Sequence, residues 1–138
     1  MKREIINPPG LVPPRGFNHG ILTTGGRLLF LAGQDATGAD GRIVAPGDLI
    51  AQFAQALGNL TTVVEAAGGK AEHVVRLTIY VKSRDDYAAK LKPLGEVYRR
   101  YFGDHYPAMA LFEVSDFFQT DALVEIEGIA VLDEADKV

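Results

Sequence analysis

"DLIAQFAQALGNLTTVVEAAGG", residues 48–69, is the stretch that decides the fold. Its large apolar side chains recur every three or four positions, which is the spacing of one face of an α-helix; they are Phe53, Leu57, Leu60 and Val64. Asp48 is a favourable N-cap, and the two closing glycines are a typical stop signal. The sequence therefore predicts an amphipathic helix that needs a surface to cover its apolar stripe.

A suitable surface follows in "HVVRLTIYVK", residues 73–82. Its β-branched residues alternate with polar ones, a pattern typical of a strand covered on one face. The face expected to lie on the helix carries Val75, Leu77, Ile79 and Val81, and the opposite face carries Val74, Arg76, Thr78, Tyr80 and Lys82.

A second helix is predicted after Ser83, which has the residue type of an N-cap with an acidic residue three positions on. Its apolar stripe runs to about Gly103 but contains Pro93. Proline removes a backbone donor and clashes with the preceding turn. We therefore expect a kink or a break there, with Pro93 opening a second helical piece.

The flanks of this central region are predicted to be strands and loops. "FNHGILTT" and "RLLFLAGQ" meet at Gly25-Gly26, which indicates a β-hairpin. Four prolines make residues 1–16 look irregular, and residues 35–47 read as a loop with a short extended turn near Arg42–Val44. Downstream, "YPAMALFEV" (106–114) and "LVEIEGIAV" (123–131) read as strands, followed by a charged tail at about 133–138.

The predicted order ββαβαββ favours a single α+β two-layer domain over residues 1–138, with a mixed sheet and two helices on one face. The other face of the sheet is also rich in apolar residues, such as Leu123, Ile129 and Val131. An apolar face of this size is expected to be covered by another copy of the chain. We therefore expect a homo-oligomer.

Composition excludes several classes of function. Apolar residues make up 47% and charged residues 23% of the 138, and 14 Lys and Arg against 18 Asp and Glu give a net charge of −4. Without a basic cluster, nucleic-acid or anionic-membrane binding is not expected. The absence of Cys excludes disulfides and thiol chemistry and suits a reducing compartment. No apolar run is long enough for a membrane span, so a cytoplasmic protein is expected.

Five pieces in order resemble the RidA (YjgF/YER057c/UK114) family: "LAGQD", the helix at 49–69, "VVRLTIYVKSRDDYA", "YPA" and "VEIEGIAV". The resemblance covers about residues 17–132. It implies a chorismate-mutase-like fold, a homotrimer, and a small-molecule cleft between neighbouring subunits. In the best-known branch it implies a hydrolase, a deaminase that converts enamines and imines to 2-keto acids and ammonia.

The resemblance also implies residue roles. The Glu that positions water corresponds to Glu125, and the backbone groups that line the cleft correspond to Gly33 and Gln34. Two hydroxyl residues of the cleft are replaced, Ser by Ala32 and Tyr by Phe17. His19 lies close to Phe17 in the sequence and is a further candidate for the cleft.

The most consequential replacement is at Met109. The resemblance implies that the deaminases of the family have an Arg at the corresponding position, which binds the substrate carboxylate. A guanidinium offers a planar fork of donors, and a thioether offers none. Loss of such an ion pair costs about 2–5 kcal/mol of binding, or about 30- to several-thousand-fold. Arg15, Arg27 and Arg76 are candidates to replace it, and the sequence does not place any of them in the cleft.

The remaining polar residues are assigned more ordinary roles. A Glu125 between apolar walls would have a raised pKa suited to acid–base work on water, or would be a structural carboxylate. Glu113 and Glu127 are interpreted as structural or interface residues, and His73 and His105 as solvent-facing. No spacing of His or acidic residues predicts a metal site, and no phosphate loop is present, so no cofactor is expected.

Three functions remain open from the sequence. The first is hydrolysis of an enamine, imine or related metabolite with Glu125 positioning water. The second is a non-catalytic, ligand-binding or regulatory trimer in which Met109 and Phe17 shape an apolar pocket. The third is action on RNA, which the acidic balance opposes.

Overall fold

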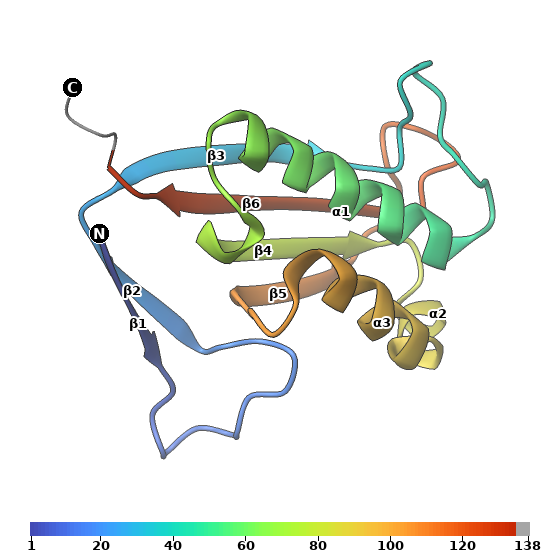
Figure 1. Ribbon diagram of the computed structural model, residues 1–138. Helices are drawn as coiled ribbons and strands as arrows, with labels where there is room; N and C mark the ends of the chain where they lie inside the picture. Colours follow the sequence, from blue (N-terminus) through green and yellow to red (C-terminus); the bar gives the residue numbers. More distant parts are fainter. Residues whose placement is uncertain (135–138) are drawn as a thin grey trace.

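The computed structural model describes residues 1–134 and has an α+β, two-layer architecture (Figure 1). The strands are β1 (Lys2–Ile6), β2 (Gly20–Thr24), β3 (Arg27–Gln34), β4 (Val74–Val81), β5 (Ala108–Glu113) and β6 (Val124–Leu132). The helices are α1 (Leu49–Ala66), α2 (Arg84–Ala89) and α3 (Leu91–Phe102), with a 3-10 turn at Ala71–His73. The predicted fold class is therefore confirmed.

The main sheet has four strands in the order β3-β6-β4-β5. β4 and β5 run parallel, whereas β6 is antiparallel to both β3 and β4, so the sheet is mixed as predicted. Helices α1 and α3 lie side by side over one face of this sheet (Figure 1). Within residues 1–134 the opposite face carries no helix, and it is called the open face.

Helix α1 forms for the reasons read in the sequence. The Asp48 carboxylate accepts a hydrogen bond from the amide of Ala51 at 3.0 Å, and Gly68 takes the left-handed conformation (φ 89°) that ends the helix. The four residues of the predicted stripe are at most 1% exposed. Each buried side chain of this kind contributes about 1.5–3 kcal/mol.

The predicted break in the second helical region is present. The residue between α2 and α3 is Lys90, whose φ and ψ of −121° and 24° are not helical. Pro93 then lies in the first turn of α3, where a missing donor costs nothing. Ser83 caps α2 by accepting a hydrogen bond from the amide of Asp86 at 3.1 Å. The region thus contains two helices, so residues 1–134 hold three α-helices where the predicted order has two.

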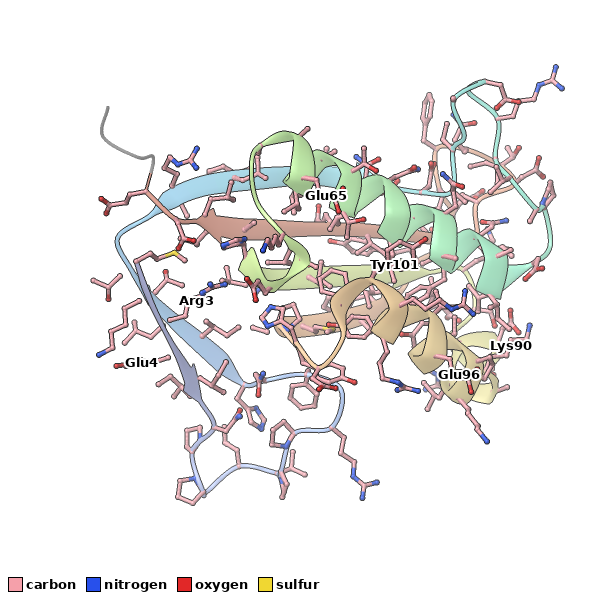
Figure 2. The ribbon with its side chains drawn as sticks, in the orientation of Figure 1. Arg3, Glu4, Glu65, Lys90, Glu96 and Tyr101 are labelled. Carbon is pink, nitrogen blue, oxygen red and sulfur yellow. The ribbon has the colours of Figure 1, made fainter. Side chains whose placement is uncertain are left out.

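Helix α3 packs closely against α1 because α1 has a glycine at the contact. A Cβ built on Gly58 would lie 3.2 Å from the hydroxyl oxygen of Tyr101, which projects from α3 (Figure 2). Glu65 of α1 and Tyr101 line the same surface hollow. The contact fixes α3 over β5, and this placement matters for the cavity described below.

Strand β4 departs from simple alternation at its start. Val74 pairs with Ala130, but Arg76 pairs with Ile129, so the register shifts between them. This irregularity puts Val74 in the core at 0% exposure and leaves Val75 only half-buried. The prediction that Val75 belongs to the helix-covered face is therefore wrong, whereas Leu77, Ile79 and Val81 lie there as expected.

The predicted hairpin of β2 and β3 is wrong. β2 pairs with β1, from Lys2 opposite Thr24 to Ile6 opposite Gly20, and the two form a separate sheet beside the main one (Figure 1). Gly25 and Gly26 both have positive φ and turn the chain toward β6 instead. A Cβ on Gly26 would lie 2.6 Å from the Leu132 carbonyl oxygen, so this corner requires glycine.

The expectation of an irregular segment over residues 1–16 is therefore wrong for Lys2–Ile6, which form β1. The short extended turn expected near Arg42–Val44 is present as a bridge between Thr37 and Ile43. Of the predicted tail, Asp133 and Glu134 have no regular structure, and 135–138 lie outside the described residues. None of the helices described in residues 1–134 has the length and apolar character needed to cross a membrane.

Candidate functional site

A cavity of about 510 Å³ lies on the helix side of the sheet, between β5, the helices α2 and α3, and the N-terminal loop. Its volume falls within the range of about 300–1,000 Å³ found for small-molecule sites. Most of its wall is apolar or aromatic. The lining residues are Arg15, Gly16, Phe17, Phe53, Ile79, Tyr87, Leu91, Leu94, Gly95, Tyr98, Arg99, Tyr106, Met109, Ala110 and Leu111.

The aromatic part of the wall is held by ring packing. Tyr98 stacks on Tyr106 with ring centroids 5.1 Å apart, and Phe53 meets Tyr87 edge-on at 6.2 Å. The Tyr98 hydroxyl donates a hydrogen bond to the carbonyl oxygen of His105 at 2.6 Å. Burial raises the pKa of both Tyr87 and Tyr98, so these hydroxyls remain neutral at physiological pH.

The N-terminal loop is fixed against β5 through Asn18. Its amide nitrogen donates to the Pro107 carbonyl oxygen at 3.1 Å and its side-chain amide donates to the Tyr106 carbonyl oxygen at 2.6 Å. Asn7 in turn donates to the Asn18 side chain at 2.8 Å. This network brings Phe17 to the cavity, so the long loop is preorganised at the site.

Met109 lies on the same side of the sheet as the helices. It is opposite Leu77 in the ladder between β5 and β4, it is half-buried, and its side chain packs on the core and lines the cavity. Phe17 and Met109, two residues assigned to the cleft from the sequence, are thus brought together. Neither side chain can donate a hydrogen bond to a ligand.

Glu125 lies on the open face. It is opposite Tyr80 in the ladder between β6 and β4, and its neighbour Ile126 points into the core at 0% exposure. Burial, followed by the charges of Asp35 and Glu127, raises the pKa of the Glu125 carboxyl. A carboxyl with a raised pKa accepts a proton from water more readily than an ordinary carboxylate.

Gly33 and Glu125 are in close contact. A Cβ on Gly33 would lie 2.9 Å from Oε2 of Glu125, so any larger residue would displace the carboxylate. The register between β3 and β6 shifts after Leu31, and Ala32 and Gly33 are exposed there. The side-chain amide nitrogen of Gln34 lies 3.5 Å from the Ala32 carbonyl oxygen, which is long for a hydrogen bond, so this contact is weak. The structure therefore places Gly33 against Glu125, whereas Gln34 is the ladder partner of Ile126.

The predicted site residues thus form two groups on opposite faces of one protomer. Ladder partners share a face and successive residues alternate, so Met109 beside Leu77 and Glu125 beside Tyr80 point in opposite directions. One chain alone does not bring these two side chains together. A site that uses both requires two protomers.

His19 is near the cavity but does not line it. Its ring meets Phe17 edge-on at 5.1 Å, its amide donates to Asn7 at 2.8 Å, and its Nε2 lies 2.7 Å from the Val12 carbonyl oxygen. These contacts hold the N-terminal loop in shape. His19 therefore positions Phe17 within the protomer.

The expectation that His73 and His105 face solvent is wrong. His73 is 6% exposed; its Nδ1 accepts from the Lys70 amide at 2.8 Å and its Nε2 lies 3.3 Å from the Asp133 carboxylate. His105 is half-buried, with Nε2 at 2.6 Å from the Val74 carbonyl oxygen. Both rings satisfy backbone groups at element ends, which explains their burial.

The other two carboxylates have structural contacts. Glu127 accepts a hydrogen bond from the Tyr80 hydroxyl at 2.7 Å on the open face. Glu113 accepts one from the Arg84 amide at 2.9 Å, at the first turn of α2. Within residues 1–134, no group of three or more His, Cys, Asp or Glu side chains has the arrangement of a metal site.

Two arginines line the cavity, and the sequence pointed to only one of them. Arg15 was one of three proposed substitutes for the missing cation, and the structure places it on the cavity wall. Arg27 instead donates to the Asp133 carbonyl oxygen at 3.0 Å, and Arg76 lies in β4 opposite Ala108. Arg99 was not singled out. Its spacing of eight residues from Leu91 along one helix was the available signal.

Comparison with known proteins identifies the family. The family described as Endoribonuclease L-PSP matches residues 11–132. The chain belongs to the RidA (YjgF/YER057c/UK114) family. Among RidA relatives, a RutC family protein of Pyrococcus horikoshii is 38% identical over 105 residues, which are 76% of this chain and 79% of the relative. A 2-iminobutanoate/2-iminopropanoate deaminase of Escherichia coli is 37% identical over 89 residues, 62% of this chain and 66% of the relative.

Solved RidA-family structures share the fold. A Rid family protein of unknown function from Yersinia pestis has a TM-score of 0.85 at 36% identity, covering 96% of this chain and all of that one. Escherichia coli TdcF with bound serine has a TM-score of 0.65 at 29% identity, covering 93% and 98% of the two chains. The predicted chorismate-mutase-like fold is thus confirmed.

Proposed function

We propose that this RidA-family protein hydrolyses a reactive imine or enamine to a carbonyl compound and ammonia. The observation that carries the proposal is Glu125, a carboxylate with a raised pKa that lies in contact with Gly33 on the open face. A relative named 2-iminobutanoate/2-iminopropanoate deaminase supports the choice of reaction. In this proposal Phe17, Met109, Ala32 and Gln34 belong to the walls that hold the substrate.

The proposed site is shared by two protomers of a homotrimer. The cavity beside Met109 comes from one protomer, and Glu125 comes from the open face of its neighbour. The open face supports this arrangement because it exposes large apolar side chains: Leu28 is 65%, Phe30 71% and Phe112 53% exposed. Apolar patches of this kind are typical of surfaces that are covered in an assembly. β5 is also an edge strand, so the cavity lies at the border of the sheet.

The chemistry needs one base and one water. Glu125 accepts a proton from water while the water oxygen bonds to the imine carbon and the imine nitrogen takes up a proton. The protonated Glu125 then returns its proton to the carbinolamine nitrogen, and the C–N bond breaks as ammonia leaves with the bonding electron pair. The hydroxyl proton is released to solvent as the C=O group forms, which balances the proton that the imine nitrogen took up from solvent. An enamine first takes a proton at carbon and enters the same sequence as an imine. A carboxyl with a raised pKa suits these steps because it both accepts and returns a proton.

Met109 favours a second candidate, a trimer that binds a ligand without consuming it. The cavity around Met109 lacks the guanidinium fork at that position, and such a loss costs about 2–5 kcal/mol of carboxylate binding. Thermal stabilisation by a compound that remains unchanged would support this alternative.

Two substitutions on the same strand test the hydrolase. Glu125→Gln removes the base, whereas Glu127→Gln keeps an oxygen that can accept the Tyr80 hydrogen bond. Imines are generated in situ by an amino-acid oxidase, and release of 2-keto acid and ammonia is followed. We expect Glu125→Gln to lose turnover by at least about 100-fold, the usual range for a general base, and Glu127→Gln to keep most of it. Equal turnover in the wild type and Glu125→Gln, with the oligomer intact, would exclude the assigned role.

A further inference from the structure

The cavity has a charge pattern that the family resemblance does not explain. Its walls are apolar or aromatic, and two guanidinium groups, Arg15 and Arg99, also line it. Among residues 1–134, no Asp or Glu lines it. The chain as a whole has a net charge of −4, so a cavity with two cations and no carboxylate contrasts with the rest of the surface.

Neither guanidinium has a carboxylate partner within the part of the chain that the structure describes. Among residues 1–134, Arg15 and Arg99 form no ion pair, whereas nearby Arg84 and Lys90 pair with Asp85 and Asp86. Arginine side chains that line a cavity without a carboxylate partner are suited to bind an anion from solution.

Arg15 is held at the cavity by the N-terminal loop. The next residue, Gly16, has φ 71°, and Asn18 then anchors the loop to the backbone at Tyr106 and Pro107. The loop is therefore fixed within three residues of Arg15. The backbone at Arg15 is thus ordered, and its exposed side chain lines the cavity.

Arg99 reaches the cavity because α3 has a glycine one turn earlier. Leu91, Gly95 and Arg99 are spaced four residues apart and lie on one stripe of the helix. A Cβ on Gly95 would lie 3.2 Å from Nη1 of Arg99, so the guanidinium lies over the space left by the missing side chain. A glycine inside a helix costs about 1 kcal/mol relative to alanine. Its presence here is explained by the room it gives to the cavity and to Arg99.

We infer that the cavity binds an acid with a bulky apolar or aromatic body, and that Arg15 and Arg99 bind its carboxylate in place of an arginine at Met109. The body lies against Met109, Leu111 and the aromatic wall. This inference rests on the proposed function for the location of the substrate, and it names the substrate class: imines of aromatic or large apolar 2-amino acids in place of the three- and four-carbon ones in the name of the Escherichia coli relative.

The alternative reading of Arg99 is a helix-end cation. Arg99 and Arg100 both lie in the last turn of α3, where positive charge interacts favourably with the helix dipole. Arg100 shares this effect but lines a different surface hollow, beside Thr61 and Glu65. Arg100→Gln is therefore the matched control for Arg99→Gln.

Binding is measured by calorimetry with phenylpyruvate, a stable aromatic 2-keto acid, with 2-oxobutanoate, and with the neutral ketone benzylacetone. We expect the wild type to prefer phenylpyruvate, with an affinity that falls as salt is added. Arg15→Gln and Arg99→Gln should each weaken phenylpyruvate binding by about tenfold or more, as expected for a hydrogen bond to a charged group. Arg100→Gln should leave the affinity unchanged, and benzylacetone binding should not respond to any of the three substitutions.

Gly95→Ala supplies a second test that does not alter charge. We expect its folded state to be at least as stable as the wild type, since alanine favours the helix, while its phenylpyruvate affinity falls more than its 2-oxobutanoate affinity. Equal loss of phenylpyruvate binding in Arg99→Gln and Arg100→Gln, or tighter binding of 2-oxobutanoate than of phenylpyruvate, would overturn the inference.

The two proposals can fail separately. Hydrolysis of short imines that is indifferent to the Arg15 and Arg99 substitutions would leave the hydrolase standing and refute the substrate class. Arginine-dependent binding of phenylpyruvate without hydrolysis of any imine would support the assigned ligand class and refute the hydrolase.

Discussion

Gln52 of α1 is a buried polar side chain on which two loops depend, and its replacement by Met gives a quantitative prediction. It is 0% exposed. Its Nε2 donates to the carbonyl oxygens of Ala45 at 3.2 Å and Asp121 at 3.0 Å, and its Oε1 accepts from the Leu123 amide at 2.8 Å. Leu123 lies two residues before Glu125, so this contact also fixes the start of β6.

Gln52→Met keeps the length of the side chain and leaves three backbone groups without their partner. A buried group left unsatisfied costs about 1–3 kcal/mol, and the low end applies because loops can admit water, so the expected loss is about 3 kcal/mol. With a urea m-value of about 2 kcal/mol/M, the unfolding midpoint should fall by about 1.5 M.

The control is Gln55→Met, one turn along the same helix. The Gln55 side chain donates to the Asn59 side chain at 2.8 Å on a half-buried surface, so its loss should cost less than about 1 kcal/mol. Urea unfolding is followed by circular dichroism at one protein concentration, because association adds to stability. Hydrogen exchange at the Leu123 amide should accelerate in Gln52→Met alone. An equal midpoint shift in both variants would refute the reasoning.

Three further predictions concern the site and the open face. Folding raises the pKa of Glu125, so the native state binds more protons than the unfolded state between the two pKa values and stability falls as pH rises through that window. Glu125→Gln should therefore be more stable than the wild type at pH 7 and lose this advantage at pH 3; a gap in stability that does not vary with pH would contradict this. Gly33→Ala should displace the Glu125 carboxylate and reduce turnover at least about tenfold, whereas Gly10→Ala, where a Cβ meets nothing within 4 Å, should not. Phe30→Glu on the open face should give monomers by light scattering, and Val63→Glu on the outer side of α1 should not; a monomeric wild type would remove the basis for a shared site.

Several elements could be predicted from the sequence because their signals are local. The cap at Asp48, the apolar stripe and the stop at Gly68 all lie within one segment, and α1 begins and ends where they indicate. The helix break near Pro93 has an equally local cause, since proline cannot donate and excludes the preceding turn. Predictions of this kind need no knowledge of distant partners.

Pairing and face assignments were less predictable because they depend on competition between distant segments. The Gly25-Gly26 corner suggested that β2 pairs with β3. In the structure β2 pairs with β1, and β3 pairs with β6. The irregular register at the start of β4 exchanged the faces of Val74 and Val75. His73 was interpreted as exposed, since nothing local shows that Lys70 and Asp133 converge on it.

The sequence by itself determined the family, the α+β fold class and the residue types available for chemistry: an acid at Glu125, a thioether at Met109 and no thiol. Only the tertiary structure decided which of them share a site. It separates Glu125 from Met109 because ladder register sets the face of each side chain, and it brings Arg15 and Arg99, 84 positions apart, to the wall of one cavity. Register and loop anchoring are set by contacts between segments distant in the chain, and spacing along the sequence does not encode them directly.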